Sequence, residues 1–374
     1  MPVLAMVLAN AERVRNPTKR AGAGPLFQIP RDGKWGFMDR KGHVVIAPVF
    51  ADERDFFHGL AGVKLPNGKW GFIDERGKFA IPARFDEVRD FVDDLAPVRV
   101  DRKWGYIDTA GRMAIEPRFQ TAGEFREGLA RIYVWSKASC GRDAYTSENA
   151  PSYAFRFFED SGLDSGGCFP TDGRIGYIDK TGTVVIPPRF FEAQDFAGGL
   201  AAVCVEADSK FGFIDHAGAV AIAPRFNQAG PFSEGLAAVE TSAHVVGNQV
   251  VDIAWGFIDK TGALKIPDKF DYAGKFSEGL AQVAIKSGVS EGYIDHDGKM
   301  VIPARLIQTG DFSDGLAVVC ADDCVYINRS GKVVLRNDGA YWPFSDGLAV
   351  IGSGEPRVYI NKRGRRIAPY SVVK

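Results

Sequence analysis

The sequence lacks several features that mark large classes of proteins. Its formal net charge is −1, so nothing favours nucleic acid or an anionic membrane as the main partner. No run approaches the roughly 20 apolar residues that a membrane-spanning helix needs. No stretch of helical length carries apolar residues at the spacing of about 3.6 residues that marks an amphipathic helix. These absences argue against a transmembrane segment, a nucleic-acid partner and a helical fold.

The usual motifs of catalysis and metal binding are also missing. The chain has no Gly-x-Ser-x-Gly, P-loop, dinucleotide fingerprint, His-Glu-x-x-His or Cys-x-x-Cys motif. Its five histidines do not cluster in the sequence. No dense Asp-x-Asp-x-Asp series indicates a calcium loop. We therefore expect no enzymatic activity, no cofactor and no metal site.

Cysteine is scarce, with five in the chain, yet two pairs stand where disulfides are plausible. Cys320 and Cys324 flank a short turn and would face each other across a hairpin. Cys140 and Cys168 lie near the two ends of a long insertion, where a bridge would contribute about 3 kcal/mol. Cys204 would remain single. Two bridges favour a periplasmic or secreted protein, whereas five unrelated reduced thiols in a cytoplasmic protein are the alternative.

What the chain has in abundance is a repeated motif. Gly (43), Pro (20) and Phe (27) indicate many short strands joined by tight turns. The stretch Trp-Gly-Phe-Ile-Asp, or a variant of it with substitutions, begins at positions 35, 70, 104, 175, 211, 255, 291, 324 and 357. The basic spacing is about 34 residues, and two intervals are longer. A fixed period of this size is typical of solenoids, propellers and other repeat arrays.

The second repeat shows the pattern within one unit. Alternating stretches at Gly59 to Leu65 and Lys69 to Asp74 predict two strands, joined by the hairpin signal Asn67-Gly68. A turn at Gly77 leads to a third strand, and the connector could add a fourth, short one. We expect an all-β array of about nine three-stranded antiparallel meanders, arranged as an open superhelix or solenoid. A closed β-propeller is the alternative, because such units suit a blade.

Recurring side chains suggest structural roles. The aromatic residues of the motif share one strand face and are predicted to form a core; those at its first position include Trp35, Trp70, Trp104, Phe211 and Trp255. An exposed row for stacking on sugars is the alternative. The mid-strand Gly predicts a bulge or a close approach, and the Asp or Asn that ends the motif predicts a turn cap.

Charges recur with the same period. A base before the connector Phe, such as Arg84, and an acid before the next Gly, such as Glu127, predict ion pairs between repeats. A basic stripe for a polyanion is the alternative. Because the total charge is near zero, the ion-pair interpretation is the simpler one.

The repeats define the domain boundaries. Residues 1–23 precede them and are predicted to be a flexible leader or the remnant of a signal segment, and residues 24–374 form the array. Residues 136–173 are an insertion in the fourth repeat, and residues 241–252 lengthen the same turn in the sixth. Aromatic and Arg side chains dominate protein interfaces, so we expect partner contacts from Trp135, Tyr145, Tyr153, Arg156, Phe157 and Phe158.

The repeats resemble the bacterial WG, or KWG, repeat family. The resemblance rests on the Lys-Trp-Gly-Phe-Ile-Asp strand, the following x-x-Gly turn, Val184 to Phe190, and Phe-Ser-Glu-Gly-Leu-Ala at Phe232 to Ala237 and Phe276 to Ala281. It implies an all-β interaction module and supplies no catalytic residues. We therefore expect a scaffold that binds a protein through its inserted loop. An immunity or inhibitor protein against a toxin or envelope enzyme, and an envelope module that binds polysaccharide, are the alternatives.

Overall fold

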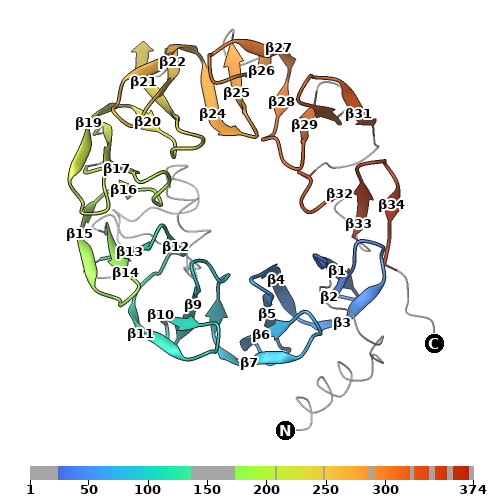
Figure 1. Ribbon diagram of the computed structural model, residues 1–374. Helices are drawn as coiled ribbons and strands as arrows, with labels where there is room; N and C mark the ends of the chain where they lie inside the picture. Colours follow the sequence, from blue (N-terminus) through green and yellow to red (C-terminus); the bar gives the residue numbers. More distant parts are fainter. Residues whose placement is uncertain are drawn as a thin grey trace. The chain divides into compact units, whose positions relative to one another are not determined.

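The structure, a computed structural model, describes residues 24–135, 173–206, 209–246, 249–285, 290–320, 324–336, 342–351 and 357–369. Within these ranges every regular element is a β-strand, and the strands form nine small antiparallel sheets (Figure 1). The expected all-β class is confirmed. The predicted leader and residues 136–172 of the insertion lie outside the described residues.

The chain divides into two compact units. One contains the residues up to Glu53, Glu75–Lys78 and the residues from Arg225 onward, and the other contains Arg54–Asp74 and Phe79–Pro224. We call them the first and the second unit. The second to fifth sheets belong to the second unit, except for the first two residues of β4 and the last two of β19. The remaining sheets belong to the first unit.

Each sheet of the second unit has four strands. The strands are β4 (Asp52–Phe57), β5 (Leu60–Lys64), β6 (Trp70–Asp74) and β7 (Phe79–Phe85) in the second sheet; β8 (Glu87–Val88), β9 (Leu95–Val100), β10 (Lys103–Asp108) and β11 (Met113–Phe119) in the third; β12 (Phe125–Arg126), β13 (Leu129–Val134), β14 (Arg174–Asp179) and β15 (Val184–Phe190) in the fourth; and β16 (Glu192–Ala193), β17 (Ala201–Cys204), β18 (Phe211–Ile214) and β19 (Val220–Phe226) in the fifth. The predicted meander thus gains a first strand from the connector.

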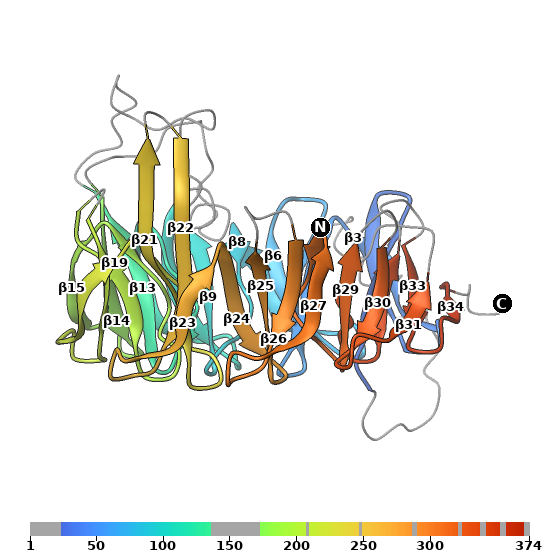
Figure 2. The ribbon, with the colours of Figure 1, turned by 90° about the horizontal axis from the view of Figure 1, so that it is seen from above.

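The first unit holds the other sheets. Its strands are β1 (Phe27–Arg31), β2 (Lys34–Met38) and β3 (Val44–Phe50) in the first sheet; β20 (Gln228–Ala229), β21 (Ala237–Val246), β22 (Gln249–Ile258) and β23 (Leu264–Phe270) in the sixth; β24 (Tyr272–Ser277), β25 (Leu280–Ile285), β26 (Ser290–Ile294) and β27 (Met300–Leu306) in the seventh; β28 (Gln308–Thr309), β29 (Leu316–Cys320), β30 (Cys324–Asn328) and β31 (Val333–Arg336) in the eighth; and β32 (Leu348–Ile351), β33 (Val358–Asn361) and β34 (Arg366–Ile367) in the ninth. Strands β21 and β22 extend beyond β24–β27 of the same unit (Figure 2).

The first and ninth sheets pack against each other within the first unit. Phe27 and Met38 share a core cluster with Leu348 and Tyr359, and the Tyr359 hydroxyl donates to the Gln28 carbonyl at 2.7 Å. Each terminal repeat therefore buries the apolar face that the other would leave in water. The terminal repeats of an open superhelix would lie apart. The nine sheets instead match the alternative expectation, the blades of a β-propeller fold.

The Gly of the motif allows two strands to approach closely. In the second sheet Trp70 pairs with Phe85 while Phe72 pairs with Ile81, so β7 bulges between these pairs. A Cβ on Gly71 would lie 2.6 Å from the Ile81 carbonyl oxygen and from the Ala83 nitrogen. Backbone atoms cannot move aside as a flexible side chain can. The expected bulge and close approach therefore both occur here.

The core lies between successive sheets and consists largely of the motif aromatics. Trp70, Trp104 and Phe211 are buried, and Trp35 and Trp255 are half-buried. The aromatic two residues later packs on a second Phe of the following repeat, which lies shortly before the turn between its first and second strands. Ring centroids lie 4.8 Å apart for Phe72–Phe91 and Tyr106–Phe125, 5.0 Å for Tyr177–Phe196 and Phe257–Phe276, and 4.9 Å for Tyr293–Phe312. Each pair contributes about 0.5–1.5 kcal/mol beyond the burial of its area.

Candidate functional site

The turns after the third strand of each repeat are nearly uniform. In the sixth repeat, Asp259 accepts hydrogen bonds from the backbone N–H groups of Thr261 and Ala263, at 2.9 and 3.1 Å. The Thr261 hydroxyl also donates to this carboxylate, and these bonds hold the pKa of Asp259 below its usual range. The same caps form at positions 39, 108, 179, 215, 295, 328 and 361. The recurring Asp or Asn thus caps the turn, as expected from the sequence.

The same edge of the sheets carries the joints between repeats, and we call it the joint edge. Glu127 adopts a positive φ of 51°, which turns its carboxylate toward the next repeat. There it accepts the N–H groups of Gly198 and Gly199 at 2.7 and 2.8 Å, and His216 lies 3.5 Å away. In the first unit, Glu234 accepts the Gly279 N–H and lies 3.3 Å from His296.

The periodic arginines have a different role from the one expected. Arg84, Arg118 and Arg189 each donate from Nη2 to a Gly carbonyl in the next repeat, at 2.8, 2.6 and 2.7 Å. Each guanidinium also lies about 5.0 Å from the ring of the adjacent Phe. The acids bond instead to backbone N–H groups and to the residue after the motif Asp. A ladder between repeats exists, but the predicted base–acid pairing is wrong.

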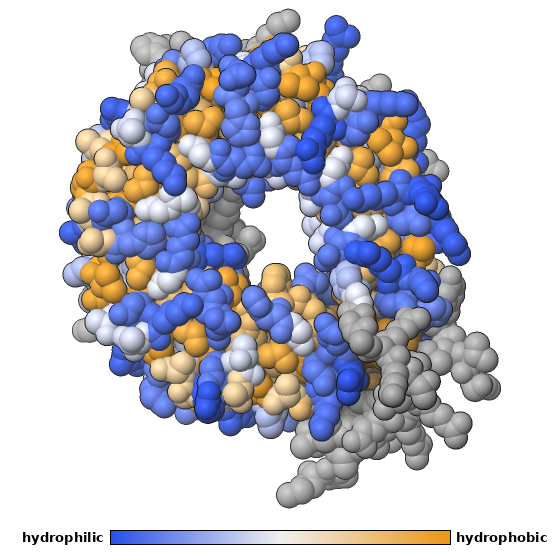
Figure 3. All heavy atoms as spheres, in the orientation of Figure 1, coloured by the Kyte–Doolittle hydropathy of each residue, from blue (hydrophilic) through white to orange (hydrophobic). Residues whose placement is uncertain are grey.

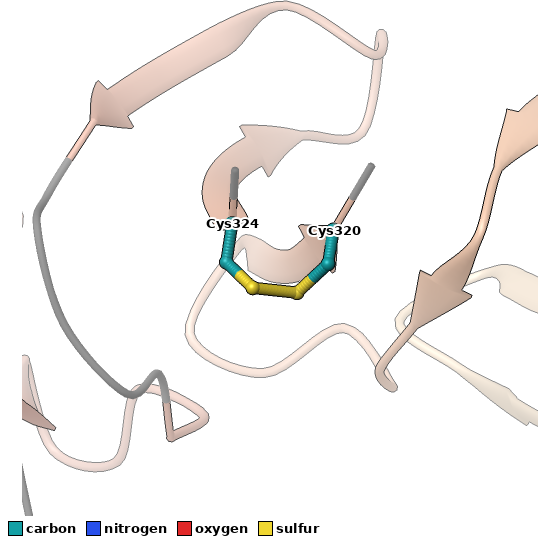
Figure 4. Close-up of a disulfide and its surroundings, with 2 residues drawn as sticks. All are labelled: Cys320 and Cys324. Atoms are coloured by element: carbon teal, nitrogen blue, oxygen red, sulfur yellow. A yellow bond between two sulfur atoms is a disulfide. The ribbon is translucent and has the colours of Figure 1, made fainter. Parts of the chain in front are cut away.

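The opposite edge of the sheets differs from one repeat to the next. It holds the turns between the second and third strands, and we call it the insertion edge. In the second repeat this turn spans only Leu65–Lys69. In the fourth repeat it contains residues 136–172, in the sixth it is the long β21–β22 hairpin, and in the eighth it is bridged by cysteines (Figures 2 and 4).

The cysteines fall into three groups. Cys320 and Cys324 are register partners on β29 and β30 and form a disulfide (Figure 4). Cys204 is a free, buried thiol whose Sγ donates to the Glu206 carbonyl at 2.8 Å. Burial raises the pKa of this thiol, which opposes a role as a nucleophile. Cys140 and Cys168 lie outside the described residues.

The strand that leads into the insertion is firmly held. The backbone N–H of Trp135 donates to Gln120 Oε1 at 3.0 Å, and Gln120 Nε2 donates back to the Trp135 carbonyl at 3.3 Å. The half-buried Trp135 ring lies 5.3 Å from that of Tyr133. Of the contacts expected from the sequence, the structure therefore places Trp135 at the base of the insertion. The others lie outside the described residues: Tyr145, Tyr153, Arg156, Phe157 and Phe158.

Cations cover two motif tryptophans of the second unit, Trp70 and Trp104. Arg54 and Lys64 lie 5.7 and 5.8 Å from the centre of the Trp70 ring. Arg89 and Arg99 lie 5.0 and 5.9 Å from that of Trp104. The two tryptophans are 6% and 1% exposed. They therefore do not form the exposed aromatic row that a polysaccharide-binding surface would need.

One cluster was missed by the sequence interpretation. Arg54 and Arg89 occupy the same position in consecutive repeats, and each begins an Arg-Asp-Phe triplet. Arg89 is 7% exposed, and burial raises the pKa of the neighbouring Asp90 to about 6. The duplicated triplet was the available signal. It was hidden because most other repeats have Gly at the Arg position, at 123, 230, 274 and 310.

Two further searches cover only the described ranges. They contain no group of three or more His, Cys, Asp or Glu side chains arranged to hold a metal ion. They also contain no helix with the length and apolar character needed to cross a membrane. On the face shown in Figure 3, hydrophilic and hydrophobic residues are interspersed.

Comparison with solved structures gives distant likenesses. The chain is similar to a eukaryotic initiation factor, with 10% sequence identity, a TM-score of 0.51, and coverage of 87% of this chain and 89% of that one. It aligns less well with BamB from Moraxella catarrhalis (11% identity, TM-score 0.37, 83% and 90% covered). Hsv2p from Kluyveromyces lactis gives similar values (9%, 0.38, 73% and 92%). At such identity, the first likeness shows the fold alone. No curated protein sequence matches the chain.

The repeats themselves give the clearest match. The model of the WG containing repeat matches residues 35–70, 70–104, 104–134, 175–207, 211–242, 255–287 and 292–323. These segments together span more than half of the chain, and each begins at or beside a motif position. Six of the seven matched segments begin in a four-stranded sheet, and the first begins in the three-stranded first sheet. The chain therefore belongs to the WG containing repeat family.

Proposed function

We propose that this chain is a non-enzymatic scaffold that binds a protein partner at its insertion edge, with residues 136–173 as the principal contact. The contrast between the two edges supports this proposal. Turns at the joint edge have capped, repeated geometry, whereas turns at the insertion edge differ in length and chemistry. Loops that vary on a constant scaffold are where repeat proteins typically carry recognition.

The base of the insertion has the properties of a binding surface. Val134, the last residue of β13, and Val205, directly after β17, are 41% and 43% exposed. Trp135, beside Val134, is fixed by its hydrogen bonds with Gln120. A rigid aromatic next to exposed apolar side chains loses little entropy on binding. The aromatic composition of residues 136–173 extends the same chemistry.

The titrating groups near this edge favour binding over catalysis. Burial raises the pKa of Glu192 to about 7, a value suited to proton transfer. Its register partner on β17, however, is Cys204, whose own pKa is raised by burial. A base beside an un-ionised, buried thiol does not form an activated nucleophile. We therefore include the absence of enzymatic activity in the proposal.

Affinity capture with matched variants tests the proposal. The tagged full chain serves as bait in lysate of the source cells, beside a variant in which a short Gly-Ser linker replaces residues 142–167. The control is Arg112→Ala on the joint edge, where the side chain is 81% exposed. We expect the wild type and the control to retain the same protein partner and the loop variant to lose it, with an unchanged melting temperature. Equal capture by the loop variant would refute the proposal.

A further inference from the structure

In several repeats, a pair of facing positions on the first and second strands carries one long polar side chain; the sixth and eighth repeats have Gly230 facing Ala238 and Gly310 facing Val318 instead. In the fourth repeat this side chain is Arg131 and the residue facing it is Gly123, whose N–H donates to the Arg131 carbonyl at 2.9 Å. In the second repeat the long side chain, Arg54, is on the first strand and the glycine, Gly62, is on the second. A Cβ on Gly62 would lie 3.4 Å from Cδ of Arg54, so the arginine stem lies over the glycine. In the third repeat, Arg89 faces Pro97 in the same way.

In the fourth repeat this side chain makes a complete ion pair. Arg131 Nε lies 2.6 Å from Asp195 Oδ1 of the next repeat, and Nη1 donates to the Ala193 carbonyl at 3.0 Å. Arg54 is the counterpart of Arg131 on the facing strand, because it aligns in sequence with Gly123, whereas Asp90 aligns directly with Asp195. Among the described residues, however, the structure has no ion pair within 4.0 Å between Arg54 and Asp90.

The second and third repeats therefore hold incompletely satisfied arginines. Within the described ranges, Arg54 Nε and Arg89 Nη2 are buried and have no hydrogen-bond partner. Glu124, the acid that corresponds to Asp195 for Arg89, pairs instead with Arg126 at 2.9 Å. A buried N–H of a charged group without an acceptor is unfavourable. Stacking on Trp70 and Trp104 holds the two guanidinium groups in place.

Arg54 and Arg89 also place two positive charges near each other. Burial lowers the pKa of Arg89, and the positive charge of Arg54 lowers it further, although Glu87 acts in the opposite direction. The Glu87 carboxylate is already engaged by Arg99 at 2.9 Å. Two neighbouring cations with free donors have the properties of an anion site, since guanidinium groups bind oxyanions through parallel, charge-assisted hydrogen bonds.

We propose that Arg54 and Arg89 bind one oxyanion group of a ligand, a carboxylate or a phosphate, through these two N–H groups. Arg54 is the more exposed of the two residues, although its Nε is buried, whereas Arg89 is only 7% exposed and lies deeper. All the residues that take part belong to the second unit. This site does not depend on the proposed binding function of the insertion edge.

Asp90 makes the site sensitive to pH. The charged groups that act on it are Arg54 and Arg89, which favour its ionised form, and Glu124 and Asp55, which oppose it. Burial outweighs these and raises its pKa to about 6. Above that pH the ionised Asp90 competes with an incoming anion. As the pH falls through about 6, Asp90 becomes neutral and the anion binds more tightly.

Isothermal titration calorimetry of the full chain tests the proposal with two probes. Sulfate is a tetrahedral oxyanion whose charge is constant between pH 5 and 8, and N-acetylglutamate amide presents a single carboxylate. We expect saturable binding of at least one probe. The probe that binds more tightly shows whether the site prefers a tetrahedral oxyanion or a carboxylate. Arg54→Gln and Arg89→Gln should each weaken binding about tenfold or more. The exposed control Arg112→Gln should have no effect.

A third variant makes the test decisive. Asp90→Asn removes the competing charge, so it should bind the anion more tightly at pH 7.5 and lose the pH dependence near 6. If Arg89→Gln does not fold, the partly exposed Arg54 decides the question, with circular dichroism as the check on folding. The absence of saturable binding by both probes would overturn the proposal. Equal losses in Arg54→Gln and Arg112→Gln would also overturn it.

Discussion

Substitution of a motif glycine should destabilise the fold through backbone overlap. In the seventh repeat, Gly292 lies between the pairs Glu291–Leu306 and Tyr293–Ile302, opposite the bulge in β27. A Cβ on Gly292 would lie 2.5 Å from the Ile302 carbonyl oxygen and 2.7 Å from the Ala304 nitrogen, whereas ordinary contacts begin at 3.4 Å. The two strands would have to separate by ~0.9 Å.

The size of the effect follows from this separation. Overpacking of a tight site costs about 1–3 kcal/mol, and each weakened strand hydrogen bond adds about 1 kcal/mol. We therefore expect Gly292→Ala to lower the free energy of unfolding by about 3 kcal/mol. The control is Gly310→Ala in the next repeat, where the nearest atom, the Val318 carbonyl oxygen, lies 3.6 Å away. There we expect a change within about 0.5 kcal/mol, or slight stabilisation.

Urea denaturation followed by tryptophan fluorescence and by circular dichroism measures both variants. Gly292→Ala should shift the midpoint to a clearly lower urea concentration, and Gly310→Ala should leave it almost unchanged. Similar midpoints for the two variants would refute the role that we assign to strand proximity. They would leave the intrinsic flexibility of glycine as the explanation instead.

Three further predictions concern other contacts. Tyr106→Phe removes the 2.8 Å hydrogen bond from a buried hydroxyl to the Gly123 carbonyl, and should lower the free energy of unfolding by about 1 kcal/mol in urea. Reduction of Cys320–Cys324 should cost about 2 kcal/mol because the closed loop is short, and the double Ser variant should not respond to reductant. Hydrogen bonds from Thr181 hold the pKa of Asp179 below its usual 3.8. The ionised Asp179 therefore stabilises the fold above that pH, and this stabilisation is lost as the pH falls through the lower pKa of the folded state. Asp179→Ala should reduce this acid sensitivity in thermal melts at pH 2 to 5.

Much of the fold follows from the repeat. The alternating strands, the Asn67-Gly68 hairpin and the Asp caps depend on residues close in sequence, so their patterns are visible in one copy. The contact between Phe27 and Tyr359 is not local, and its ring geometry resembles that of internal pairs. The sequence therefore did not decide between an open array and a propeller. A strand as short as Glu87–Val88 carries no periodic signal either.

The candidate sites were less predictable. The positive φ of Glu127 belongs to a two-residue turn with Gly128, and the acid–Gly pattern is visible in the sequence. Its joint role is not visible there, because the N–H groups that the carboxylate accepts belong to Gly198 and Gly199, 71 and 72 positions away. The importance of Arg54 comes from Gly62 on the facing strand and from a carboxylate 36 positions further along the chain, at Asp90. A side chain acquires such a role only when several strands bring it beside groups that are distant in sequence.

The contact between the first and ninth sheets has a consequence for how this chain could evolve or be re-engineered. Arg40 Nε donates to the Asp346 carbonyl at 2.6 Å across 306 positions, just as Lys180 Nζ donates to the Asp93 carbonyl at 2.6 Å. Neighbouring repeats thus recognise each other through their surfaces, whether or not a peptide bond joins them. A circular permutant with new termini in the Leu65–Lys69 turn would keep the contacts between the first and ninth sheets, because those contacts do not depend on that turn.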